Sequence, residues 1–104
     1  MRELTMDDFD AATKTGTAVV DFWAPWCGPC KFFAPIFEAT SKERSGILFA
    51  KVNVDEQPEL AGRFGVRGIP TLVFLKDGKE AGRVSGAMPK PQFEKLLDQT
   101  LDAP

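Results

Sequence analysis

Two short apolar segments constrain the fold of this chain more than any other feature. Residues 18–23 and 47–54 are largely apolar on both of their alternating faces, and such runs are typical of strands covered on both sides. Between them, Phe33, Ile36 and Phe37 recur at the spacing of one buried helix face. Because neighbouring parallel strands need a helical crossover, this order predicts a sheet with helices packed on its faces.

A turn signal in the second half of the chain adds antiparallel strands to this sheet. Residues 71–76 and 79–84 flank Asp77-Gly78, a dipeptide that favours a tight hairpin turn. We therefore expect a mixed sheet. Capping residues, proline positions and helical periodicity predict three further helices, at residues 6–14, at 58–64 and around 93–101.

The size and charge of the chain exclude several classes of protein. Its 104 residues carry 13 basic and 15 acidic side chains, for a net charge of -2. A chain of about 100 residues has room for one domain, so we expect residues 1–104 to form a single domain. The nearly neutral charge argues against nucleic acid as a partner. The longest apolar runs are far shorter than the roughly 20 residues that cross a membrane, so we expect no membrane partner.

The absence of histidine limits the chemistry, and the N-terminal segment bears on location. Without histidine, the chain cannot build a Ser/His/Asp triad, a histidine-paired cysteine nucleophile or nearly any catalytic zinc site. Proton transfer must use a carboxylate, a lysine or a thiol. The first eight residues, MRELTMDD, are acidic where a secretion signal would be basic and then apolar. We therefore expect a cytoplasmic location if this sequence is the unprocessed one.

Both cysteines lie at the predicted junction between the first buried strand and the helix that follows it. Cys27 stands at the helix N-terminus, where free N–H groups and the helix dipole stabilise a thiolate, so we expect it to be the nucleophile. Cys30 follows three residues later, close enough on a helix to form a disulfide with Cys27. Pro29 suits the first helical turn, and Gly28 leaves the sulfur accessible.

Two other roles are open to this cysteine pair. A purely structural disulfide would close a loop of only four residues, which gains about 2 kcal/mol in loop-entropy models, and cytosolic proteins seldom keep such bridges. Two cysteines without histidine supply only half of a four-coordinate zinc site, which would then need carboxylates or a second chain. We therefore expect no metal, and we favour a pair that opens and closes.

The residues around the cysteines resemble those of a known family. The segment Trp23–Lys31, which reads WAPWCGPCK, is followed in order by Ile69-Pro70-Thr71 and Gly86. These landmarks, with the strand before them, are similar to those of the thioredoxins over nearly the whole chain. The resemblance implies an α/β thioredoxin fold, with three α/β/α layers and a central mixed five-stranded sheet flanked by four helices.

The resemblance also implies an activity, the reduction of disulfides in other proteins through Cys27 and Cys30. Gly28-Pro29 between the cysteines favours a reductant, since glutaredoxins typically carry Pro-Tyr there, and disulfide isomerases and periplasmic oxidants a histidine. The implied electron donor is NADPH through a flavin-containing thioredoxin reductase, with no cofactor bound to this chain. We expect a monomer that acts on disulfide-containing proteins. The alternative is a redox-independent binding subunit of a larger assembly.

Asp21 and Lys51 each interrupt a predicted buried strand. Burial raises the pKa of a carboxyl, and the resemblance implies that Asp21 takes the proton from Cys30 when that thiol attacks. The alternative for Asp21 is a hydrogen-bonded structural carboxyl. Lys51 on its own would extend its amine to water, whereas the resemblance implies a place near Asp21 and a part in proton balance. There Lys51 would oppose the pKa rise that burial causes.

The resemblance implies a substrate-binding surface around the cysteines. It places a cis proline at Pro70, which leaves the backbone of Ile69 free to pair with an extended substrate segment. Trp26 is expected beside the nucleophile, and Trp23 packs under the active-site loop. Gly86 either keeps a turn near the cysteines open to a docked partner or is a plain turn glycine. The expected apolar surface comprises Trp26, Gly28, Pro29, Gly68, Ile69, Pro70, Gly86 and Ala87.

Overall fold

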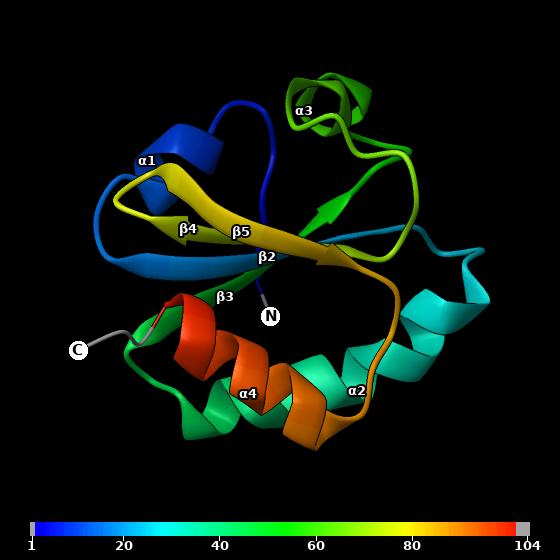
Figure 1. Ribbon diagram of the computed structural model, residues 1–104. Coiled ribbons are helices and arrows are strands. Elements are labelled where there is room, and N and C mark those ends of the chain that lie inside the picture. The colour runs from blue at the N-terminus through cyan, green and yellow to red at the C-terminus, as the bar shows by residue number, and fades with distance from the viewer. Residues whose placement is uncertain (1, 102–104) are drawn as a thin grey trace.

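The predicted strand–helix–strand unit lies at the centre of the structure. In the computed structural model, which describes residues 2–101, this unit consists of β2 (Thr17–Trp23), α2 (Gly28–Glu43) and β3 (Ile47–Asn53). β2 and β3 are parallel and paired over their whole length. Figure 1 shows α2 crossing one face of the sheet. The predicted helical crossover is therefore confirmed.

The predicted hairpin forms the other half of the sheet. β4 (Thr71–Lys76) and β5 (Lys79–Ser85) are antiparallel. Asp77 and Gly78 between them have positive φ angles of 50° and 82°, as the favoured two-residue hairpin turn requires. β4 also pairs antiparallel with β2, so the five strands lie in the order β1-β3-β2-β4-β5. The expected mixed five-stranded sheet is confirmed.

The first strand has no signal in the amino-acid pattern. β1 (Arg2–Glu3) consists of two exposed residues, and it pairs in parallel with Ala50 and Lys51 of β3. Two exposed residues cannot show an alternation, so hydrophobic periodicity does not detect such a strand. The pairing nevertheless brings the N-terminal segment next to Lys51, one of the predicted proton-transfer residues.

Helices cover both faces of the sheet and complete the three expected layers. α2 and α4 (Lys90–Thr100) lie on one face, as Figure 1 shows. α1 (Phe9–Thr13) and α3 (Pro58–Arg63) lie on the opposite face. No helix within residues 2–101 has the length and apolar content needed to cross a membrane.

The first helix is shorter than the pattern predicts. Residues 6–8 form a turn before α1 begins at Phe9, so the prediction of a helix over residues 6–14 was too long at both ends. In that turn the Thr5 carbonyl accepts hydrogen bonds from the N–H groups of Asp8 and Phe9. The Asp8 carboxylate in turn accepts a hydrogen bond of 2.7 Å from the N–H of Thr5. These contacts satisfy the backbone in a turn rather than in a longer helix.

The apolar core is divided between the two faces of the sheet. Val20 and Phe22 of β2 pack on the α1 and α3 face, whereas Val19 packs on the α2 and α4 face. On this second face, neighbouring phenylalanine rings have centroids 5.1 to 6.2 Å apart, and they come from Phe33, Phe37, Phe49 and Phe93. Because side chains alternate along a strand, Asp21 faces the same side as Val19 and Trp23.

Candidate active site

The cysteine pair lies at the N-terminus of α2, one loop after the end of β2. Cys27 is the N-cap residue of the helix, and its Sγ accepts a hydrogen bond of 3.2 Å from the N–H of Cys30. The two cysteines form a disulfide with their Cα atoms 5.2 Å apart. Cys27 is 4% exposed and Cys30 is 3% exposed. When the disulfide opens, the same N–H group and the helix terminus stabilise a thiolate on Cys27.

A second loop brings a backbone carbonyl to the sulfur of Cys27. The Ile69–Pro70 peptide bond is cis, so this part of the prediction is confirmed. The carbonyl oxygen of Ile69 lies 3.7 Å from the Sγ of Cys27. Ile69 also packs, half-buried, against the apolar cluster formed by Ala24 and the two cysteines. The structure thus places Ile69, the residue before the cis proline, directly beside the disulfide.

The turn after β5 is tied to this second loop. The N–H of Gly86 donates a hydrogen bond of 2.8 Å to the carbonyl of Pro70. The Thr71 hydroxyl contacts both the Gly68 carbonyl and the Ser85 hydroxyl. Gly86 has a φ of 100°, and a Cβ added there would meet nothing within 4 Å. Its positive φ therefore favours glycine at this position, although a larger side chain would not clash with its neighbours.

Two exposed aromatic side chains flank the cysteines on the outer surface. Trp26 is 68% exposed, and its Nε1 donates a hydrogen bond of 2.8 Å to Oδ2 of Asp55. Phe32 of α2 is 61% exposed, although it is a large apolar residue. Neither Asp55 nor Phe32 was among the predicted site residues. Phe32 could have been found, because it stands out of phase with the buried positions Phe33 and Phe37.

Asp21 is fully buried and unpaired. Its exposed fraction is 0%, and neither carboxyl oxygen has a hydrogen-bond partner within the described part of the chain. Burial raises its pKa to about 7, against the opposing effect of Lys51 and with a smaller contribution from Glu3 in the same direction as burial. Desolvation therefore outweighs the nearby lysine. Among residues 2–101, no protein group supplies the hydrogen bond that a structural role for this carboxyl would use.

Lys51 lies near Asp21 without forming an ion pair with it. The two residues are direct neighbours in the register of β2 and β3. The Nζ of Lys51 lies 4.2 Å from the centroid of the Trp23 ring, a cation–π contact. Trp23 is half-buried and packs against the cysteine cluster, as expected for a residue under the active-site loop. Lys51 thus rests on the indole and interacts with Asp21 at longer range.

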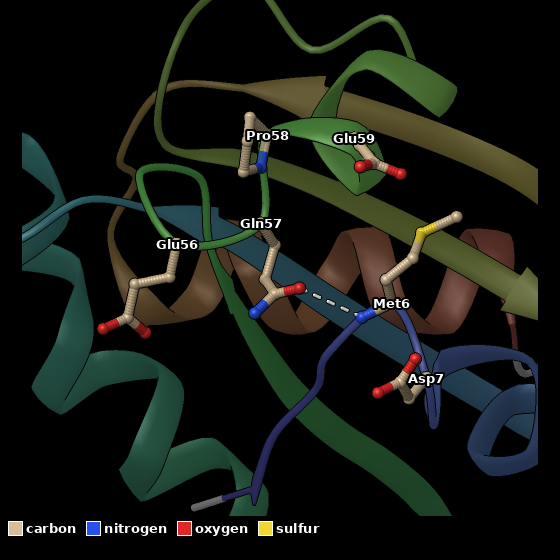
Figure 2. Close-up of a pocket in the computed structure, with 6 residues that line it drawn as sticks. All are labelled: Met6, Asp7, Glu56, Gln57, Pro58 and Glu59. Atoms are coloured by element: carbon tan, nitrogen blue, oxygen red, sulfur yellow. Dashed lines mark hydrogen bonds between the residues drawn. The ribbon is translucent and has the colours of Figure 1, made fainter.

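A surface pocket of about 250 Å³ lies elsewhere, and Figure 2 shows its lining. The N–H of Met6 donates a hydrogen bond of 3.0 Å to Oε1 of Gln57 across it. Its lining contains none of the predicted site residues and consists of Met6, Asp7, Glu56, Gln57, Pro58 and Glu59. Among residues 2–101, no group of three or more potential ligands could hold a metal ion.

Comparisons with known proteins agree with this geometry. A family model described as Thioredoxin matches residues 1–99 of the chain. A curated thioredoxin from Chlamydia caviae is 40% identical over 99 residues, which make up 95% of this chain and 97% of that protein. The chain belongs to the thioredoxin family. Together with the closed Cys27–Cys30 pair, this membership makes the protein a thioredoxin-type thiol–disulfide oxidoreductase that reduces protein disulfides by dithiol–disulfide exchange.

Proposed function

We propose that Cys27 carries out the first step of the exchange in this thioredoxin. Its thiolate attacks one sulfur of a substrate disulfide, the substrate S–S bond breaks, and the other substrate sulfur leaves as a thiolate that takes a proton from solvent. The product of this step is a mixed disulfide between Cys27 and the substrate. The position of Cys27 as the N-cap of α2 supports this role, because the N–H of Cys30 already donates to its sulfur.

The second step uses Cys30 and Asp21. The Cys30 thiol gives its proton to the Asp21 carboxylate, and the resulting thiolate attacks the Sγ of Cys27. The mixed disulfide breaks, the substrate leaves as a second thiol once it is protonated, and the Cys27–Cys30 disulfide forms. The buried position of Asp21 and its pKa of about 7 support this role, since a base with such a pKa can accept and return a proton near neutral pH. Lys51 balances the charge of that carboxylate.

The substrate segment lies against the loops that surround the disulfide. The backbone of Ile69 pairs with an extended segment of the substrate as an added strand would, which its position 3.7 Å from the Cys27 sulfur supports. Exposed Trp26 supplies apolar contact area beside the nucleophile. The proposed contact surface comprises Trp26, Gly28, Pro29, Gly68, Ile69, Pro70, Gly86 and Ala87.

The oxidised protein is reduced again by a separate enzyme. Opening the Cys27–Cys30 disulfide takes two electrons and two protons, and we assign their delivery to a flavin-containing thioredoxin reductase that draws on NADPH. This chain binds neither cofactor itself. We further propose that residues 1–104 act as a single domain, that the protein is a monomer, and that it works in the cytoplasm.

An NADPH-coupled insulin reduction assay with a thioredoxin reductase tests this function. We expect cysteine-dependent turnover by the parent protein and none by Cys27→Ser, because the variant lacks the nucleophile. Cys30→Ser is the matched control, since it keeps Cys27 and accumulates the mixed disulfide with substrate instead of completing the cycle. Absence of turnover by the parent with several reductases, or full cellular activity of a variant with both cysteines replaced by serine, would overturn the proposal.

A further inference from the structure

A row of three charged residues crosses the sheet on the α2 face. β1, β3 and β2 are adjacent, and their register pairs Glu3 with Lys51 and Lys51 with Asp21. Residues in register on neighbouring strands direct their side chains to the same face. Lys51 therefore lies between two carboxyl groups. One of them, Glu3, is exposed, and the other, Asp21, is fully buried.

The indole of Trp23 connects the exposed end of this row to its centre. The Nε1 of Trp23 donates a hydrogen bond of 3.4 Å to Oε1 of Glu3. The Nζ of Lys51 lies over the same ring, 4.2 Å from its centroid. No ion pair joins Lys51 to either carboxyl group within the part of the chain that the structure describes. Glu3 thus accepts a hydrogen bond from the same ring on which the lysine rests.

The surroundings of Asp21 contain few other charges. Its neighbour in β4 is Leu72. The buried residues of the two helices on this face are also uncharged, and they are Cys30, Phe33, Phe37 and Thr40 of α2 and Phe93 and Leu97 of α4. Among the described charged residues, Lys51 and Glu3 are the two that act on Asp21, with opposite signs.

We propose that Glu3 is a positioning residue for the second step of the exchange. Its carboxylate anchors the Trp23 indole, shares the positive charge of Lys51 and thereby sets how readily Asp21 accepts the proton of Cys30. The inference rests on the proposed role of Asp21. The inference predicts the direction of an effect. Without the negative charge of Glu3, the positive charge of Lys51 stabilises the Asp21 carboxylate more strongly, so Asp21 ionises at lower pH.

The test is a titration of the Asp21 carboxyl in the oxidised protein by carbon-13 NMR, with Asp21→Asn to assign the signal. We expect Glu3→Gln to move the midpoint from about 7 toward acid by about half a pH unit at low salt, and by less at high salt. In stopped-flow experiments, the pH profile for attack by Cys30 on the mixed disulfide shifts in the same direction, because this attack requires the ionised form of Asp21.

Two variants separate charge from structure. Asp7→Asn removes one negative charge from an exposed residue of the same N-terminal segment, and it leaves the midpoint in place. Glu3→Asp keeps the charge and retains a midpoint close to that of the parent. Equal midpoints in Glu3→Gln and Asp7→Asn, or equal shifts in Glu3→Gln and Glu3→Asp, overturn the inference. The titration needs neither substrate nor reductase, so it can fail while the protein still reduces disulfides.

Discussion

The two faces of β2 carry different kinds of residue although they belong to one strand. Toward α1 and α3 the strand presents Val20 and Phe22, which are buried among apolar neighbours. Toward α2 and α4 it presents Val19, Asp21 and Trp23. Trp23 packs against the cysteines, and Asp21 is the register neighbour of Lys51. Both faces pack against apolar clusters, but only the second also holds a buried carboxyl, which has no hydrogen-bond partner among residues 2–101. The difference is that the face under the cysteine-bearing helix combines an apolar core with one buried carboxyl, whereas the opposite face of the strand is apolar.

The largest expected effect comes from the apolar face of β2. Phe22 is 0% exposed, so Phe22→Ala leaves a cavity and lowers the free energy of unfolding by about 3 to 5 kcal/mol. Urea unfolding measures this loss. Phe32→Ala is the matched control, because the exposed side chain of Phe32 changes stability by less than about 0.5 kcal/mol. Equal losses in the two variants would show that burial of Phe22 adds nothing to the stability of the fold.

On the opposite face, removing the buried charge of Asp21 is expected to raise the free energy of unfolding rather than lower it. The pKa of Asp21 is about 7 in the folded protein, against 3.8 for an ordinary aspartate, so the folded protein holds this proton more tightly than the unfolded chain. The contribution of Asp21 to the free energy of unfolding therefore falls by roughly 4 kcal/mol as the pH rises from the lower to the higher pKa. Above the higher pKa this contribution is constant.

Asp21→Asn removes that dependence. We expect the variant to gain stability relative to the parent between about pH 4 and pH 7, with the difference unchanged at higher pH. Urea unfolding of the oxidised proteins across this range measures it. Parallel stability profiles for Asp21→Asn and the parent would show that Asp21 does not titrate near neutral pH.

A smaller effect is expected from the lysine beside the buried carboxyl. Lys51 lowers the pKa of Asp21, so Lys51→Met raises the midpoint of the Asp21 titration by about one pH unit. Attack by Cys30 on the mixed disulfide then needs a higher pH. Lys42→Met, at the far end of α2, serves as the control and leaves the midpoint unchanged. A midpoint that falls in Lys51→Met would reverse the assigned sign.

The smallest effect concerns the exposed surface beside the proposed nucleophile, Cys27. Asp55→Ala removes the acceptor of the Trp26 hydrogen bond and frees the indole. We expect the KM for a protein substrate to rise about two- to five-fold, as for the loss of one hydrogen bond, with kcat and stability nearly unchanged. Glu56→Ala is the control, and steady-state insulin reduction is the measurement. An unchanged KM in Asp55→Ala would remove this contact from the binding surface.

Most of the sheet was predictable because its signals are local. The buried runs, the periodicity of α2 and the Asp77-Gly78 turn each depend on neighbouring residues, and the structure contains the corresponding elements. β1 was missed because two exposed residues show no pattern, and α1 was predicted too long because the turn at residues 6–8 satisfies the same backbone groups. Short elements at the ends of a chain depend on their tertiary partners.

The residues of the site also fall into those that the sequence predicted and those that it did not. The cysteine spacing and its place at a helix start predict a redox pair from the sequence alone, since both depend on a few consecutive residues. Asp55 and Glu3 were not predicted, because an exposed carboxylate looks the same in a sequence whether it contacts Trp26, Trp23 or water. Their partners come from other strands and loops.

By itself, the sequence determined that two thiols without histidine stand where a helix begins, and that a carboxyl and an amine interrupt two buried strands. The tertiary structure decided how strongly these groups act on one another. Strand register sets Lys51 beside Asp21 and Glu3 beside Lys51, and folding removes water from Asp21 so that burial outweighs the lysine. Electrostatic interactions depend on distance and solvent exposure, and the chain acquires both only when it folds.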